Sequence, residues 1–204
     1  MKTKLCLLIL LIVGLSVQLS ANPINGLFER IDKGASKKFV IEFKKGADDF
    51  FELDQKGTKV VVRGNNYVNI ATGINWYLKY YAGIQLSWNG MQAKLPQVLP
   101  PVPRKERHET SLSLRYDFNY CTYSYTMAFW DWERWEKEID WMALHGINLP
   151  LAAVGQECIW FNMLQKLGYS KDEINRFIAG PAFLAWWAMN NLELSLIHIS
   201  EPTR

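Results

Sequence analysis

The sequence predicts an α/β protein in which a small α+β domain precedes the first strand–helix units of an incomplete (β/α)8 barrel. Three observations predict this arrangement. Short β-branched and aromatic runs with one amphipathic helix fill residues 22–98, a proline-rich linker follows at 99–109, and strand–helix alternation occupies 110–193. A complete barrel needs about 250 residues, so the ring is not expected to close within this stretch.

Composition excludes several classes of protein. The 204 residues are 49% hydrophobic and 21% charged, which is too apolar for a disordered chain. The formal charge of +3 falls to about +1 without Lys2 and Lys4, so no nucleic-acid partner is expected. Seven of the nine tryptophans lie between Trp130 and Trp187. The second half of the chain is therefore where we look for a site.

Residues 1–21 have the pattern of a secretory signal peptide. Lys2 and Lys4 precede the apolar run Leu5–Val13, and small or polar residues follow up to Ala21. The run is far shorter than the roughly 20 residues that span a bilayer. We expect an exported protein, periplasmic or secreted, with no membrane association after cleavage; an uncleaved anchor is the alternative.

The expected elements of residues 22–98 follow from local pattern. The domain is interpreted as accessory and is expected to fold alone, because it contains no cluster of acids, histidines or cysteines. Its elements are strands at Phe39–Phe43, Phe50–Asp54, Val60–Arg63 and Ile84–Trp88, a hairpin turn at Asp54–Gly57, and a helix over Tyr67–Tyr81 that ends before Gly83.

The second half alternates strands with helices. The strands are expected at Leu112–Phe118, with an aromatic loop continuing to Tyr125, and at Ile147–Val154. The helices are expected from Asp131, as N-cap, to Gly146; from Gly155 to about Gly168; and from Ser170, as N-cap, to Ile178. The first of these helices has Trp132, Trp135, Ile139 and Met142 on one face and the pair Glu133 and Lys137 on the other.

Active sites of such barrels gather on the loops that follow the strands. Two loops qualify, at residues 117–125 and 154–157. Aromatic rings alternate with small polar groups in the first, a composition typical of pockets that stack and orient sugar rings. The sequence therefore predicts a carbohydrate site, although each aromatic is equally compatible with a place in the barrel core.

Catalytic and metal chemistry have little support in the sequence. Asp117 and Glu157 are the only acids on the two loops, but Asp117 suits a role in orienting Arg115 or capping a loop, and Glu157 suits the start of a helix. We therefore assign no catalytic residue. Cys121 and Cys158 lack metal-site or redox spacing and are expected to be free or locally buried, with no metal and no cofactor.

The histidines and the last residues carry no expected function. His108 lies in the predicted linker, and the dipole of a helix explains His145. Residues 194–204 resemble the translation of a sequencing adapter and are predicted to be a non-native tail; a real strand over Ser195–Ile199 is the alternative.

Several long blocks of the second half carry a family resemblance. They resemble the N-terminal part of the α-N-acetylglucosaminidases, glycoside hydrolase family 89. The blocks are Asn119–Tyr125, Trp130–Trp135, Glu138–Leu144 with Gly146–Leu149, Gly155–Glu157 and Gly180–Trp186.

The resemblance implies an exported, retaining exo-glycosidase that removes terminal α-linked N-acetylglucosamine from glycans. It also implies two catalytic glutamates on later barrel strands, which no segment here matches. The positions that match the family's substrate pocket are Asn119, Cys121, Tyr125, Trp186 and Met189, and Gln156 and Glu157 are placed behind them as orienting residues. Trp187 departs from the smaller residue expected there.

Two other functions remain open from the sequence. A non-catalytic exported carbohydrate-binding module would use the aromatic loop as a complete site. A structural cell-surface protein is less favoured, because the aromatic residues cluster on predicted loops instead of in a repeat.

Overall fold

The computed structural model describes residues 22–125 and 127–180, which form two compact units. The first unit comprises residues 22–111 and 143–145, and the second comprises 112–142 and 146–180. Both are mixed α/β, as predicted. The predicted signal peptide, Trp186, Trp187, Met189 and the tail 194–204 lie outside the described residues.

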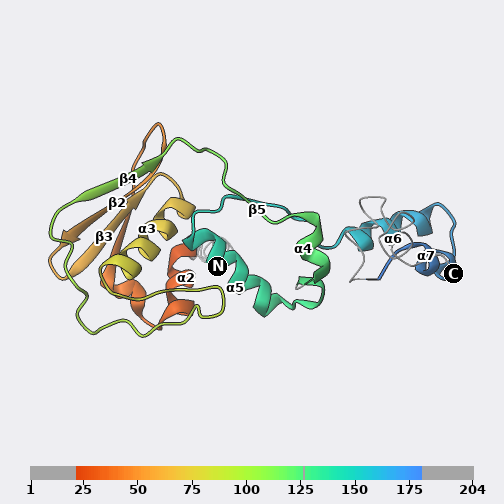
Figure 1. The fold of residues 1–204 in the computed structure, drawn as a ribbon, viewed down its shortest axis with the longest axis horizontal. Helices are drawn as coiled ribbons and strands as arrows, with labels where there is room; N and C mark the ends of the chain where they lie inside the picture. Colours follow the sequence, from red (N-terminus) through yellow and green to blue (C-terminus); the bar gives the residue numbers. More distant parts are fainter. Residues whose placement is uncertain (1–21, 126, 181–204) are drawn as a thin grey trace, which may run out of the picture. The chain divides into compact units, whose positions relative to one another are not determined.

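A four-stranded sheet and two helices build the first unit (Figure 1). The strand order is β1-β3-β2-β4; β1 runs parallel to β3, and β2 is antiparallel to both β3 and β4. Three of the four predicted strands and the long helix are confirmed, and α2 is an addition. The elements are α2 (Pro23–Ile31), η1 (Ala35–Lys38), β1 (Phe39–Phe43), β2 (Asp49–Lys56), β3 (Lys59–Gly64), α3 (Tyr67–Tyr80) and β4 (Glu106–Thr110).

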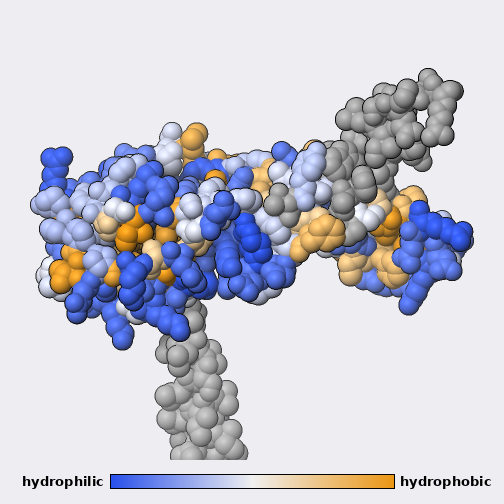
Figure 2. Space-filling view, turned by 60° about the horizontal axis from the view of Figure 1, so that its bottom comes forward, coloured by the Kyte–Doolittle hydropathy of each residue, from blue (hydrophilic) through white to orange (hydrophobic). Residues whose placement is uncertain are grey.

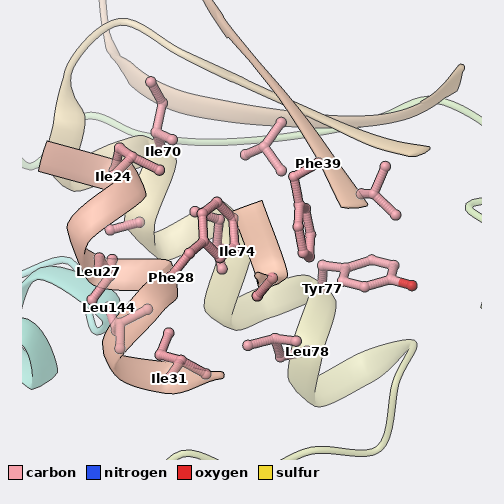
Figure 3. Packing of buried hydrophobic residues seen from close by; sticks show 14 of the residues in the cluster. Ile24, Leu27, Phe28, Ile31, Phe39, Ile70, Ile74, Tyr77, Leu78 and Leu144 are labelled. Atoms are coloured by element: carbon pink, nitrogen blue, oxygen red, sulfur yellow. The ribbon is translucent and has the colours of Figure 1, made fainter. Parts of the chain in front are cut away.

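Alternation along the strands separates a core face from an outer face. Phe51 and Leu53 of β2 and Val62 of β3 belong to the buried core. Figure 3 shows how Phe28 of α2 and Ile74 of α3 meet within this core. Helix α3 contributes residues at three- and four-residue spacing, and Leu144 is also fully buried in this core. The helical residues at the centre are Leu27, Phe28, Ile31, Ile70, Ile74, Tyr77 and Leu78.

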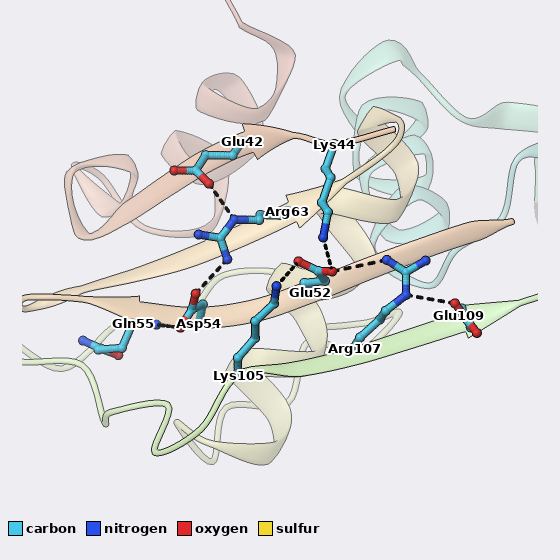
Figure 4. Close-up of polar contacts among 9 residues, drawn as sticks. All are labelled: Glu42, Lys44, Glu52, Asp54, Gln55, Arg63, Lys105, Arg107 and Glu109. Carbon is cyan, nitrogen blue, oxygen red and sulfur yellow. Dashed lines mark hydrogen bonds and ion pairs between the residues drawn. The ribbon is translucent and has the colours of Figure 1, made fainter. Parts of the chain in front are cut away.

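The outer face of the sheet carries an ionic network around a buried carboxylate (Figure 4). The Glu52 carboxylate forms ion pairs with Lys44 at 2.7 Å, Lys105 at 2.9 Å and Arg107 at 3.2 Å. The Glu52 side chain is only 3% exposed. Burial by itself would raise the pKa of Glu52, but hydrogen bonds from these three cations outweigh it and lower the pKa to about 2. The network ties β2 to β4 and to the segment after β1.

The proline-rich segment differs from the predicted linker. Leu99 and Val102 are buried in the core, and the Val102 N–H donates to Gln55 at 3.1 Å. Residues 106–110 form β4, paired with β2 along five positions. The His108 ring stacks on Phe51 and lies tilted against Trp76. The segment therefore completes the sheet of the first unit, and the unit extends past residue 98.

Two local predictions in this unit are also wrong. No strand forms at 84–88, where a single bridge joins Ser87 and Gly90, because the chain there first closes the end of α3 through the Ile84 N–H and the Leu78 carbonyl. The hairpin turn lies at Gly57, with φ of 61°, because β2 continues through Lys56.

The second unit contains two very short strands and five helical segments. They are β5 (Tyr116–Asp117), α4 (Tyr120–Tyr125), η2 (Met127–Phe129), α5 (Trp132–Leu144), β6 (Leu149–Pro150), α6 (Gln156–Lys166) and α7 (Lys171–Phe177). Strands β5 and β6 are parallel, as in the start of a barrel, but each has two residues instead of the predicted seven or eight.

Helix ends in this unit follow the sequence closely. The Asp131 carboxylate accepts from the Arg134 N–H at 2.9 Å, and Ser170 forms a capping box with Glu173. Gly146 follows α5 with φ of 81°, and Lys137 pairs with Glu133 at 2.9 Å.

The predicted inward face of α5 is wrong in part. Met142 is buried, but Trp132 and Ile139 are exposed, and Glu138 is fully buried in an ion pair with Arg134 at 2.9 Å. A helical period of 3.6 residues predicts which side of α5 is apolar. It does not predict that the buried side of α5 holds a glutamate paired with an arginine.

The surface of the second unit includes exposed apolar residues. Ile159, Leu167 and Phe177 are each more than half exposed, and Figure 2 shows apolar atoms at the end of the view that holds α6 and α7. No helix in the described part of the chain is both long and apolar enough to span a membrane.

Candidate active-site pocket

The candidate site begins where β5 ends. Phe118 has φ of 71°, a left-handed conformation that is uncommon for a residue with a large side chain. The Asp117 carboxylate accepts from the Phe118 N–H at 2.8 Å, and the Asn119 side chain accepts from the Thr122 N–H at 3.1 Å. These bonds turn the chain from a strand into α4 within two residues, so the predicted aromatic loop is mostly helix.

Leu151 joins this turn to the second strand. Its N–H donates to the Asp117 carbonyl at 3.0 Å, and its carbonyl accepts from the Tyr123 hydroxyl of α4. Tyr123 is buried, and this burial raises the pKa of its phenol, with the backbone at Ala153 acting in the opposite direction. The first predicted loop is thus held to the residue that follows β6 by one backbone hydrogen bond and one hydroxyl.

A cluster of aromatic rings packs around Tyr123. The Tyr123 ring stacks on Trp135 with centroids 6.0 Å apart and meets Phe118 edge-on at 5.8 Å. Trp130 meets Trp135 edge-on at 4.9 Å, and the Arg134 guanidinium lies 3.9 Å above the Trp130 ring. For these rings the core interpretation is the better one, because they pack on one another.

A cavity of about 540 Å³ opens beside this cluster, within the second unit. Its walls are largely apolar or small, with Glu157, Asn175, Cys158 and the Tyr123 phenol as the polar groups. The lining residues are Tyr123, Met127, Ala128, Ala153, Val154, Gly155, Glu157, Cys158, Phe161, Asn175, Ile178, Ala179 and Gly180.

The chemistry of the cavity suits binding. Its volume is in the range of small-molecule sites, and its few polar groups lie among apolar walls. Among the described lining residues Glu157 is the only carboxylate. No group of three or more His, Cys, Asp or Glu within residues 22–125 and 127–180 is arranged to hold a metal ion.

Comparison with known proteins assigns both units. Residues 22–101 match the family model "Alpha-N-acetylglucosaminidase (NAGLU) N-terminal domain", and residues 115–201 match the model of the tim-barrel domain of the same proteins. The chain belongs to the α-N-acetylglucosaminidase family.

Two relatives of this family show how far the likeness extends. Human α-N-acetylglucosaminidase is 45% identical over 161 residues, which are 79% of this chain and 22% of the human protein. A family 89 glycoside hydrolase from Clostridium perfringens, solved with 2-acetamido-1,2-dideoxynojirimycin, aligns with a TM-score of 0.77 at 40% identity, covering 82% of this chain and 20% of that one. The chain therefore spans about a fifth of the length of these relatives.

Further structures of the Clostridium perfringens enzyme name its ligands. One is a complex with PUGNAc, and another, with two glutamates changed to glutamine, is a complex with its substrate GlcNAc-α-1,4-galactose. Both align with this chain as the first structure does.

Of the described residues that were expected at the family's pocket, only one lines the cavity. Glu157 lines the cavity, whereas Asn119, Cys121, Tyr125 and Gln156 lie near it in sequence but are not among its lining residues. The side-chain oxygen of Asn119 already caps α4, which leaves its amide N–H groups for a ligand. Cys121 is partly exposed and Cys158 exposed, both as free thiols.

Several lining residues were not predicted from the sequence. Tyr123 lies in the same aromatic segment as Asn119 and Cys121, and nothing in its spacing distinguishes it from Tyr120 or Tyr125. Phe161 and Asn175 come from α6 and α7, where a helical pattern gives no indication of which residues turn toward a strand end.

Proposed function

We propose that this chain supplies the N-terminal domain and the first barrel units of an exported, retaining α-N-acetylglucosaminidase that removes terminal α-linked N-acetylglucosamine from glycans. The observation that carries the proposal is the cavity at the ends of β5 and β6, in the part of the chain that matches the family's barrel domain. Barrel enzymes place their active sites at this end of the strands.

The lining residues support a sugar as the ligand. Apolar walls from Met127, Val154 and Phe161 suit the C–H faces of a pyranose and the methyl of an acetamido group. Glu157 and Asn175 offer an acceptor and a mixed donor–acceptor for hydroxyl and amide groups.

We also propose that the 204-residue chain binds such a sugar without cleaving it. Retaining glycosidases need two carboxyl groups about 5–5.5 Å apart. Glu157 is the single acid among the described lining residues, and the Asp117 carboxylate is engaged with the Phe118 N–H. The alternative, a non-catalytic binding module, would also bind the sugar without cleaving it. It differs from the proposed function because no later barrel strands would supply it with catalytic glutamates.

Export rests on the leader. The cationic start and the nine-residue apolar run Leu5–Val13 support secretion. Expression of the chain with and without residues 1–21 tests this part separately: we expect cleaved protein outside the cytoplasm only when the leader is present, and equal retention of both forms would contradict it.

Ligand titration tests the site. The purified chain is titrated at mildly acidic pH with 2-acetamido-1,2-dideoxynojirimycin, whose protonated ring amine is cationic, and with the uncharged PUGNAc. Because Glu157 is a carboxylate in the cavity wall, E157Q is expected to weaken binding of the cationic compound about fivefold and to change binding of PUGNAc by less than twofold. E133Q, at an exposed position of α5, is the matched control and should change neither. Saturable binding that E157Q leaves unaltered for both ligands would place the ligand elsewhere.

A further inference from the structure

The ladder of backbone hydrogen bonds between β5 and β6 ends before the Leu151 carbonyl has received a backbone donor. The Leu149 N–H donates to the Arg115 carbonyl and the Leu151 N–H donates to the Asp117 carbonyl, in steps of two residues. In a parallel pair with this register, the next bond would run from the Asn119 N–H to the Leu151 carbonyl. The left-handed turn at Phe118 removes Asn119 from the strand, so this backbone donor is lost.

The Tyr123 hydroxyl occupies the vacated place. It reaches the Leu151 carbonyl from the first turn of α4, 28 positions away in sequence. Its ring is fixed by Trp135 on one face and by the edge of Phe118, the same residue whose backbone ends the strand. A partly buried carbonyl that loses its donor costs free energy, and this hydroxyl supplies the missing donor.

We infer that Tyr123 is a positioning residue of the pocket, whose hydroxyl replaces the strand hydrogen bond lost at Phe118 and holds residues 151–157 against α4. Ala153, Gly155 and Glu157, which follow Leu151, line the cavity. The inference extends the proposed function where ligand binding is concerned, but the fixing of this segment is a property of the chain itself.

Hydrogen exchange of the 204-residue chain, with and without the hydroxyl, tests the inference. Y123F keeps the ring and removes only the donor. Y120F is the matched control, because Tyr120 lies in the same helix and packs on the same aromatic cluster, while its hydroxyl makes no hydrogen bond in the described part of the chain. We expect the Leu151 amide, which donates to the Asp117 carbonyl, to exchange at least tenfold faster in Y123F, with α7 unchanged, and to keep the wild-type rate in Y120F.

Inhibitor binding gives the second measurement. Affinity for 2-acetamido-1,2-dideoxynojirimycin should fall at least fivefold in Y123F and remain within twofold in Y120F. Replacement of Tyr123 by para-aminophenylalanine, which restores a donor at the same position, should return both exchange and affinity toward wild type. This rescue separates positioning by the hydroxyl from a general loss of folding in Y123F.

The outcomes distinguish the two claims. Exchange of the Leu151 amide within twofold of wild type in Y123F, equal acceleration in Y120F, or failure of para-aminophenylalanine to restore slow exchange would each overturn the role of Tyr123. A wild-type chain that does not bind the inhibitor but shows the expected exchange pattern would refute the proposed binding and leave the positioning role supported.

Discussion

The Tyr77 hydroxyl donates a hydrogen bond of 2.6 Å to the Pro100 carbonyl, joining the last turn of α3 to the proline-rich segment. Tyr77 is fully buried, and burial raises its pKa to about 12. The pKa of Tyr77 therefore reports whether the proline-rich segment is packed on the first unit.

Alkaline pH should break the hydrogen bond from Tyr77 to Pro100, because the ionised phenol has no proton to donate. A folded-state pKa of about 12 against an ordinary value near 10 means that the fold prefers the neutral phenol, so its contribution is complete below pH 10 and is lost as the pH rises through 12. We expect a loss of about 2 kcal/mol of unfolding free energy over this range, measured by denaturant unfolding at pH 9 and pH 12. Y77F should remove this part of the slope, and Y67F, at an exposed tyrosine of the same helix, should retain it. Equal slopes in Y77F and wild type would contradict the assignment.

Acid should weaken the opposite face of the sheet. The pKa of Glu52 is lowered to about 2, so its contribution is present above the ordinary value near 4.5 and disappears as the pH falls to 2. E52Q should therefore be less stable than wild type at pH 6 by about 2–3 kcal/mol and should lose less on acidification. Urea unfolding at pH 6 and pH 3 measures both quantities. The control E109Q removes a mostly exposed partner of Arg107 and should cost less than about 1 kcal/mol.

Leu144 should contribute to the first unit although it belongs to α5. It is fully buried among the core residues of that unit, and the Thr72 hydroxyl contacts the adjacent Ala143 carbonyl at 3.4 Å. L144A should cost about 2–5 kcal/mol, measured by the protection of α3 amides against hydrogen exchange. L167A, at a site that is 67% exposed, should leave this protection unchanged. Normal α3 protection in L144A would show that residues 143–145 are dispensable for this core.

The boundary of the first unit gives a further prediction. A chain of residues 22–98 lacks β4 and the buried Leu99 and Val102, which leaves β2 as an open sheet edge. A chain of residues 22–111 retains all three. We expect the longer chain to have a melting temperature higher by at least 10 °C, and equal melting would contradict the assignment of β4 to this unit.

Local pattern was sufficient for the elements that local interactions build. The strands at 39–43 and 60–63, the helix from Tyr67 and the caps at Asp131 and Ser170 all follow from residues a few positions apart. β4 could not be predicted in this way: its sequence, Glu106–Thr110, is mostly charged, and it is a strand because Lys105 and Arg107 reach Glu52 on one face while His108 packs between aromatic rings on the other.

The site shows the same division. The position of Glu157 at the start of a helix, after a strand, was readable from the sequence, and it lines the cavity. The role of Tyr123 depends on an acceptor 28 residues away and on the left-handed turn at Phe118, neither of which leaves a local signal.

The sugar pocket that we propose for the second unit lacks the acids that would cleave the sugar. It is tested most directly by adding 2-acetamido-1,2-dideoxynojirimycin to the isotope-labelled 204-residue chain, and by incubating the same protein with an aryl α-N-acetylglucosaminide. We expect saturable amide shifts centred on residues 123, 153–157 and 175, and no release of the aryl group. Shifts confined to residues 22–111, or measurable turnover by the purified chain, would contradict it.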